Sequence, residues 1–410
     1  MFRNRNVMFC VFVLPCLVFS KLPETNPQLD QLIRNALENN RAIMVQQQKV
    51  ISQSNEIITA GSLPNPSLSA GYFISPVVTK EGPQEWKLAI TQNLPWPGKL
   101  SGKEKIARLR LDIENEQLRQ VTLQVVSDVR ATYEQLRFLA SEEAITNENF
   151  DILKQLESVI RLKYTTSRAS QSYLLKVQMD LLRLEDDLIS ITAKRPVLLA
   201  KLNRLLGDGA YADNLIFDNI LSFEKDLPAI EYAGIEKNPQ LLTAQKSISI
   251  GSEAVRLAKL SAKPDFSVGL DNIILKDGTG KNPLMVRAGI SLPIWFGKNK
   301  AIKESANAKL AGADSRLQDV RLSLDAQLES LNYKLDDSRR KYNLYIHDLI
   351  PLAEQNYKVA ESAYLSDEVD FETYLNSEKN LLQAKLEGAK MRLHYFTSHA
   401  EYLELTAQEF

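Results

Sequence analysis

The chain has 410 residues, of which 44% are hydrophobic and 25% are charged, so it can bury a sizeable core and is not disordered. Its formal net charge of −1 excludes a bulk basic nucleic-acid binder, and its 16 glycines are few for an all-β protein. Residues 103–206 contain no glycine and one proline, and residues 298–410 contain two glycines and one proline. The chain therefore alternates long helical tracts with short, turn-rich tracts.

The N-terminus has the pattern of a signal peptide, and we expect residues 1–20 to be removed by cleavage after Ser20. Two arginines precede the apolar run 7–19, which is shorter than the about 20 residues that a helix needs to cross a membrane. The alternative is lipidation at Cys16, which is less favoured because a proline precedes this cysteine. Cys10 is the other cysteine, so cleavage after Ser20 leaves no thiol for a disulfide, a nucleophile or a metal site.

The second half of the chain resembles the first at an offset of about 198 residues, which indicates duplication of a half-protein and not a solenoid repeat. We expect a first repeat at 21–215 and a second at 216–410, each with the order helix, strand, strand, long helix, turn, long helix. Four pairs of segments carry the similarity, in the same order along both halves: Glu38–Asn40 with Glu236–Asn238, Pro66–Gly71 with Pro264–Gly269, Leu94–Lys99 with Leu292–Lys298, and Tyr164 with Tyr364.

Four segments alternate apolar and polar residues, which predicts strands at about 66–75, 85–94, 264–275 and 284–293. Each has the length of about 9–11 residues with which a tilted strand crosses a bilayer. A half-exposed sheet in a soluble protein gives the same alternation, but four such strands in an exported chain favour a membrane β-barrel. In the last strand Val286, Ala288 and Ile290 are expected to face lipid, and Arg287, Gly289 and Ser291 to face the lumen.

Four strands cannot close a barrel, because the smallest membrane-spanning barrels have about eight. An open sheet edge is unfavourable in lipid, where unpaired N–H and C=O groups find no water. We therefore expect several chains to share one barrel, and three copies of four strands give twelve strands around a three-fold axis.

The two glycine-poor tracts predict helical hairpins at about 97–207 and 297–407. Helix signals lapse at 165–172 and 365–370, where short polar or acidic side chains compete for backbone hydrogen bonds, so each tract is expected to fold back there. Each hairpin then has helices of about 65 residues, on the order of 100 Å long. Pro351 is expected to kink its helix in the preceding turn.

The sequence resembles the TolC family of outer-membrane efflux channels over the whole mature chain. The resemblance rests on the duplicated plan, on Leu94–Lys99 at the strand-to-helix junction, on Pro351–Gln355 followed by Tyr364, and on Tyr374–Glu378. It implies a homotrimer whose twelve-stranded β-barrel in the outer membrane continues into a long periplasmic α-helical barrel. It also implies outer-membrane lipid as surroundings, in a Gram-negative-type bacterium, and docking to a periplasmic adaptor and an inner-membrane pump.

The resemblance assigns roles to particular residues. Pro97, Gly98 and Lys99 at the junction are most similar to the branch that serves heavy-metal efflux pumps. There is one departure from the family pattern, because Ser167 and Asp367 stand where members often have glycine after each tip tyrosine. The strand-to-helix junctions are expected to depend on their prolines and glycines, namely Pro95, Pro97, Gly98, Pro293 and Gly297.

The two predicted helix turns carry the candidate gate: Tyr164 and Arg168 in the first turn, and Tyr364, Asp367, Glu368 and Asp370 in the second. In a trimer the second turn brings three carboxylates per chain to one axis, where acidic rings favour cations. Arg168 is a natural salt-bridge partner for these carboxylates, and the resemblance implies that such ion pairs and tyrosine hydrogen bonds close the tunnel entrance. The alternative is an acidic, solvated loop without a gating role.

The sequence offers little sign of catalytic or metal chemistry. His394 and His399 are about 140° apart on a helix, so with His347 they are best interpreted as helix-surface histidines and not as a metal site. No nucleophile, phosphate-binding or zinc-protease motif is present. We expect no enzymatic activity and no cofactor, and the sequence does not name the exported substrate.

Two other functions explain parts of the pattern. A periplasmic adaptor also has long helical hairpins, but the duplicated hairpin and the four bilayer-length strands argue against it. An exported enzyme on a helical scaffold is the second alternative, and no constellation of residues supports it.

Overall fold

The computed structural model describes residues 26–167, 169–207, 215, 217, 227–228, 230, 232–276 and 281–408. The predicted signal peptide at 1–20 and Arg168 of the candidate gate lie outside these residues. The chain forms two compact units, and each contains residues from both halves of the sequence. The sheet unit comprises 44–120 and 239–323, and the hairpin unit comprises the described residues up to Ile43, 121–238 and 324–408. The division into repeats at 215/216 stays a prediction, because the compact units follow a different division.

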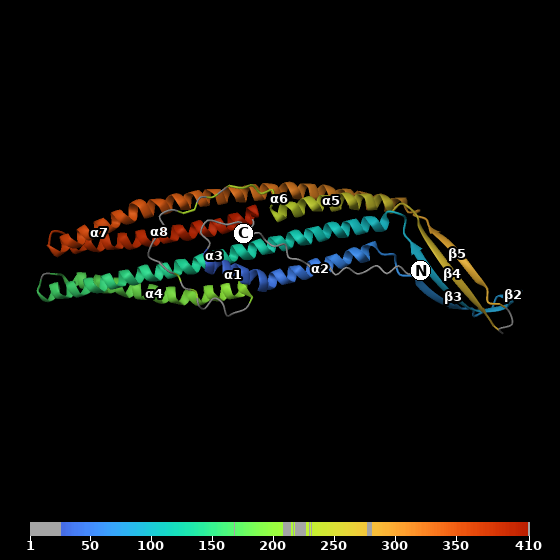
Figure 1. Ribbon diagram of the computed structural model, residues 1–410, viewed down its shortest axis with the longest axis horizontal. Coiled ribbons are helices and arrows are strands. Elements are labelled where there is room, and N and C mark those ends of the chain that lie inside the picture. The colour runs from blue at the N-terminus through green and yellow to red at the C-terminus, as the bar shows by residue number, and fades with distance from the viewer. Residues whose placement is uncertain are drawn as a thin grey trace. The chain divides into compact units, whose positions relative to one another are not determined.

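The sheet unit contains four antiparallel strands in the spatial order β1 (Ser67–Tyr72), β3 (Gly82–Leu94), β4 (Asp265–Leu275) and β5 (Leu284–Ser291) (Figure 1). The short strand β2 (Val78–Thr79) pairs with the beginning of β3. The central pair, β3 with β4, joins segments from the two halves of the sequence. Within the described part of the chain, β1 and β5 are edge strands with one open side each.

The two faces of this sheet differ in polarity, as the period-two pattern predicts. In register, Leu68 of β1 opposes Ile90 of β3, Ile90 opposes Leu270 of β4, and Leu270 opposes Val286 of β5. This row of four apolar side chains is exposed, with 78% of Leu68 and 74% of Val286 accessible. The opposite face carries Thr91, Asp271 and Arg287, which contact one another through polar atoms.

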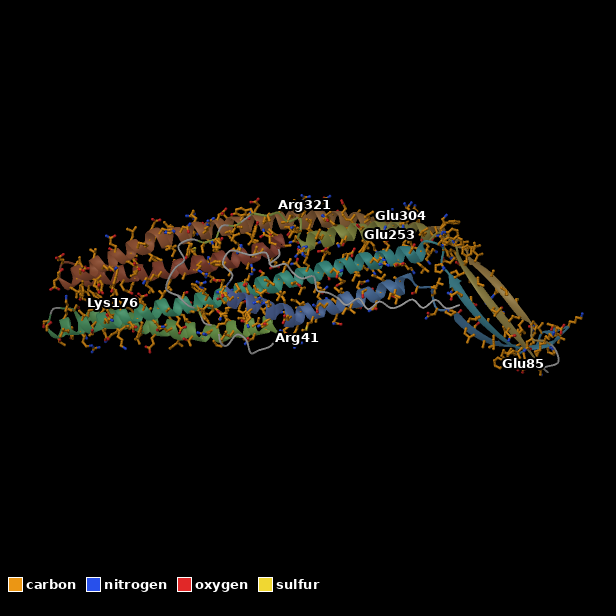
Figure 2. All side chains as sticks on the ribbon, viewed as in Figure 1. Arg41, Glu85, Lys176, Glu253, Glu304 and Arg321 are labelled. Carbon is orange, nitrogen blue, oxygen red and sulfur yellow. The ribbon has the colours of Figure 1, made fainter. Side chains whose placement is uncertain are left out.

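Helices of the sheet unit are joined by polar side chains. They are α2 (Arg41–Gly61), α5 (Pro239–Leu260) and the beginnings of α3 (Lys99–Thr165) and α6 (Phe296–Leu344). Lys105 of α3 pairs with Glu253 of α5, which is labelled in Figure 2, at 3.4 Å. Gln46 of α2 donates to the Glu114 carboxylate of α3 at 2.7 Å. None of the described helices is both long and apolar enough to cross a membrane.

The hairpin unit is a layer of long helices (Figure 1). It contains α1 (Pro27–Asn39), the rest of α3 and of α6, α4 (Gln171–Leu206), α7 (Ile350–Leu365) and α8 (Phe371–Thr406). Side-chain contacts join the four hairpin helices: α7 packs on α8, Lys385 of α8 pairs with Glu148 of α3, and Lys379 of α8 pairs with Asp180 of α4.

A π-helical turn, η1 (Tyr345–Leu349), interrupts the helix that leads into α7. Pro351 follows directly, and its ring and missing N–H are incompatible with an α-helical bond to the residue four positions earlier. The Ile350 N–H bonds instead to the carbonyl of Tyr345, five residues back. The irregularity in the helix before Pro351 is therefore a single π-helical turn, in which the backbone hydrogen bond spans five residues and not four.

Corresponding asparagines make the same contact in the two halves of the chain. Asn40 Nδ2 donates to the Leu205 carbonyl at 2.8 Å, and Asn238 Nδ2 donates to the Leu405 carbonyl at 2.7 Å. Both asparagines are buried, where an unpaired amide is costly. The helices that precede these contacts end in left-handed residues, Gly207 after α4 and Ala407 after α8.

Candidate functional site

The candidate site lies at the two tip turns of the hairpin unit, where α3 turns into α4 at 166–170 and α7 turns into α8 at 366–370. Both turns use a residue in the left-handed region, Ser167 with φ of 56° and Asp367 with φ of 59°. These are the positions where glycine is common in the TolC family. A non-glycine residue in this conformation costs about 1 kcal/mol, so both turns retain the left-handed backbone in spite of their side chains.

The second helix of each hairpin begins with a side-chain cap. Ser170 accepts a hydrogen bond from the Ser172 N–H at 3.2 Å, and Asp370 accepts one from the Thr373 N–H at 2.8 Å. The hydrogen bonds from Thr373 hold the pKa of Asp370 below its usual range. Asp370, predicted as a gate carboxylate, therefore also begins α8. Glu368 is exposed beside it, and its backbone N–H donates to the Ala363 carbonyl at 2.8 Å.

Asp367 forms an ion pair with Lys163 of α3, at 2.7 Å between Oδ1 and Nζ. The same ammonium donates to the Tyr364 carbonyl at 3.3 Å and lies 4.3 Å from the centroid of the Tyr364 ring. Lys163 thus ties the first hairpin to the second turn by three contacts. Sequence analysis named Arg168 for this role and missed Lys163, although a lysine in the last turn of a helix is favourably placed near the helix end.

Tyr364 belongs to an aromatic stack beneath the second turn. Its ring is 6% exposed and lies 5.4 Å from the Tyr374 ring at an interplanar angle of 13°. Tyr357 stacks on the other side of Tyr374, and their hydroxyls are 3.3 Å apart. Burial raises the pKa of Tyr364. Tyr164, the corresponding residue of the first turn, is 41% exposed, so the two predicted gate tyrosines have different surroundings.

An apolar core joins the two hairpins below the turns. It draws on all four helices of the layer, with Leu153, Leu156 and Ile160 from α3, Val177 and Leu184 from α4, Ala360 and Tyr364 from α7, and Phe371, Tyr374 and Leu375 from α8. Ion pairs surround this core: Lys176, labelled in Figure 2, pairs with Glu372, and Lys379 pairs with Asp180 at 2.7 Å. The tip turns therefore rest on a rigid, well-packed base.

Glu378 is a buried acid inside this base, with 2% of its surface exposed. Its pKa is raised to about 7, mainly by burial and also by the nearby Asp180 carboxylate, whereas Asn149 and Lys379 act in the opposite direction. Sequence analysis quoted Glu378 only as part of a family motif. Its burial depends on residues of α3 and α4, so the local sequence carries no signal for it.

The first strand-to-helix junction is held by a carboxylate from the other half of the chain. Asp265 accepts hydrogen bonds from the Trp96 N–H at 2.7 Å and from Lys99 Nζ at 2.8 Å. Gly98 has φ of 96°, a conformation that favours glycine. It follows Pro95 and Pro97 and directly precedes the start of α3. Sequence analysis named Pro95, Pro97 and Gly98 but missed Asp265, which looked like an ordinary polar strand residue.

The second junction is built differently. The carbonyl of Pro293 accepts a hydrogen bond from Asn299 Nδ2 at 3.2 Å. Gly297 lies inside the first turn of α6 and has no positive φ, so it does not reproduce the role of Gly98. The two predicted junction glycines therefore have different functions in the backbone.

The histidines do not gather with other metal-ligating side chains. Burial lowers the pKa of His399 to about 4, with the positive charge of Arg130 acting in the same direction, and the ring stacks against Tyr395. Among the described residues, no group of three His, Cys, Asp or Glu side chains is arranged to hold a metal ion.

Comparison with protein-family models and with curated proteins found no match to this sequence. Solved structures do match. The outer membrane protein VceC from Vibrio cholerae aligns with a TM-score of 0.79 at 15% identity, covering 92% of this chain and 96% of that one. The CmeC outer membrane channel of Campylobacter jejuni aligns with a TM-score of 0.75 at 15% identity, covering 96% and 91%. A membrane protein from Pseudomonas aeruginosa aligns with a TM-score of 0.81 at 14% identity, covering 93% and 94%.

These identities are low, so the alignments establish a shared fold. The chain has the fold of these outer-membrane channels over nearly its whole length. The resemblance to the TolC family, inferred from junction and tip residues, is confirmed at the level of the fold.

Proposed function

We propose that this protein is the outer-membrane channel of a three-part efflux system, a passive duct that docks to a periplasmic adaptor and an inner-membrane pump. The observation that carries the proposal is the four-stranded sheet, which has one exposed apolar face and two open edges. A soluble protein rarely exposes such a face, whereas lipid covers it without penalty. The shared fold with outer-membrane channels supports the same assignment.

The strand order supports closure of a barrel shared by several copies. The strands alternate in direction from β1 to β5, so β5 of one copy and β1 of the next are antiparallel and can pair edge to edge. Pairing of this kind satisfies the backbone groups that lipid cannot solvate. Three copies of four strands give a twelve-stranded barrel, above the lower limit of about eight.

Exposed apolar side chains on α4 and α7 support contact between copies. Exposed apolar residues on α4 include Leu182 and Ile189, and those on α7 include Val359 and Leu352. Both pairs are seven residues apart, the spacing of one face of a coiled coil. If α4 of one copy packs antiparallel to α7 of the next, Leu182 can contact Val359 at the same time as Ile189 contacts Leu352. We propose that this contact closes the α-helical barrel.

The tip turns then form the periplasmic entrance of the duct. The Lys163–Asp367 pair holds the second turn against the first hairpin, and the stacked tyrosines join α7 to α8 beneath that turn, which together favour a closed resting state. Glu368 and Asp370 add carboxylates that favour cations at the constriction. Arg168 remains the proposed partner from the first turn. The most specific part of the proposal is assignment to the heavy-metal branch, which rests on Pro97, Gly98 and Lys99 alone.

The proposal is tested by the location, mass and conductance of the purified protein. We expect it in the outer-membrane fraction, with a protein mass of three mature chains in detergent and a measurable conductance in planar bilayers. A monodisperse monomer that keeps its strand signal contradicts the shared barrel. Recovery from the inner-membrane or soluble fraction contradicts the channel and favours a periplasmic adaptor.

A further inference from the structure

The polar face of the sheet holds a carboxylate between two cations. Asp271 of β4 is fully buried, with 0% of its surface exposed. Lys87 of β3 lies 2.7 Å from Asp271 Oδ2, and Arg287 of β5 lies 3.4 Å from Asp271 Oδ1. About half of the Arg287 side chain and a third of the Lys87 side chain remain exposed. The surface of this cluster is therefore cationic, while its anion is covered.

Arg287 is held in a fixed position across the sheet. Its Nη2 donates to Thr91 Oγ1 of β3 at 3.0 Å, so the side chain crosses the whole width of β4. It crosses at Gly269, where an added Cβ would lie 3.3 Å from Arg287 Nη2 and 3.3 Å from Thr91 Oγ1. The glycine provides the space in which the guanidinium lies against the backbone. The positive charge is thus built into the sheet and is not carried by a freely rotating side chain.

Among the described residues, no further ion pair joins this cluster. Two cations and one carboxylate leave a net charge of +1 for the cluster. Asp265, at the helix end of β4, is paired with Lys99. Glu85 occupies the irregularity of β3 between Gln84 and Trp86 and has no partner in the β4 register. Of the other positions on this face, Ala89, Ser267 and Gly289 are small, Ile273 and Met285 are large and apolar, and none of the five is charged.

We propose that Lys87, Asp271 and Arg287 form an anion-favouring ring inside the barrel, and that the duct passes anionic solutes at this level. The inference rests on the proposed function, because the shared barrel brings three copies of the cluster around one lumen. Asp271 is the seventh of 11 residues in β4, which places the ring near the middle of the strands. Rings of Arg and Lys select anions in pores, as acidic rings select cations. The ring is opposite in sign to the carboxylates of the tip turns.

The test is the ratio of chloride to potassium permeability of the purified trimer in planar bilayers, measured from reversal potentials at low salt. Arg287→Gln removes the fixed charge and leaves the cluster neutral. In water, a unit charge about 10 Å from a permeating ion changes its local concentration by about a factor of two. Arg287→Gln is therefore expected to lower the ratio by about twofold or more, and Asp271→Asn to raise it. Salt above about 0.1 M screens the effect, which gives a second signature.

Two further variants separate charge from folding. Arg287→Lys keeps the charge but loses the planar contact with Thr91, so its ratio should remain near the parent value. The double change Arg287→Gln with Asp271→Asn restores a net charge of +1 and should also remain near it. An unchanged ratio in Arg287→Gln trimers that still conduct overturns the anion ring and leaves the channel intact. Absence of any conductance in the parent protein refutes the proposed function itself.

Discussion

Replacing Glu378 with glutamine should make the hairpin unit more stable at alkaline pH and leave it nearly unchanged at acid pH. The carboxyl is 2% exposed and has a pKa of about 7, against an ordinary value of 4.5. A pKa raised in the folded state means that the stability is fully present below about 4.5 and is lost as the pH rises through about 7. The difference of about 2.5 pH units corresponds to roughly 3 kcal/mol once the group is ionised.

Glutamine has the size of glutamate and carries no charge at any of these pH values. Because its amide needs hydrogen-bond partners of its own, we expect Glu378→Gln to recover about 2 kcal/mol of this cost near pH 8. The assay is thermal unfolding of the detergent-purified protein, followed by circular dichroism from about pH 5 to about pH 8. The unfolding midpoint of the variant should exceed that of the parent at the alkaline end, and the two should converge at the acid end.

A matched control is available on the same helix. Glu401 of α8 is exposed, so Glu401→Gln should shift the midpoint little at either pH. If Glu378→Gln and the parent protein lose stability equally between these pH values, the carboxyl is not an acid held neutral by burial. The reasoning from its burial is then wrong.

Three other changes probe the rest of the molecule. Lys163→Met removes the ion pair to Asp367 and the contact with the Tyr364 ring, so it should lower the stability by about 1 kcal/mol. It should also raise the resting conductance of the proposed trimer, and an unchanged conductance argues against a gating role for these contacts. Ala288→Arg on the apolar face of β5 should cost about 2–4 kcal/mol in a bilayer, whereas Ser291→Asn should cost little, and equal costs mean that the strand does not face lipid. Ser167→Gly relieves the left-handed strain of the first turn, so it should stabilise the protein by roughly 0.5 kcal/mol and raise the unfolding midpoint slightly. Ser167→Val should lower the unfolding midpoint.

The parts of the fold that depend on local pattern could be predicted from the sequence. Alternation predicts the strands, and their observed bounds differ from the expected ones by a few residues, as at β3, which begins at Gly82. Loss of helix-forming residues predicts both tip turns, and the proline at 351 marks the π turn before it. In each case the cause lies in the backbone preferences of the residues concerned, which neighbours do not change.

The parts that depend on contacts between distant segments could not be predicted in the same way. Lys163 lies in the last turn of α3, and its partner Asp367 is 204 residues further along the chain. In the sequence, Asp265 is one of several polar residues in an alternating strand. Its role at the first junction depends on β4 lying beside Trp96. From the sequence alone, Glu378 would be assigned to the surface. It is buried because three other helices cover it. Burial and pairing of this kind are properties of the packed layer, and no window along the sequence contains them.

The pairing of β3 with β4 has a consequence for the order in which the chain folds. Residues 82–94 can complete their hydrogen bonds only when residues 265–275 have been synthesised. In the meantime the first pair of strands has an unpaired edge and an uncovered apolar face, which is the kind of segment that aggregates. Contacts between segments so far apart also form slowly, whereas the helical hairpins form from neighbours in sequence. A chaperone should therefore be needed for the sheet and not for the hairpins, so truncation before residue 265 should yield a chain with folded helices and aggregation-prone strands.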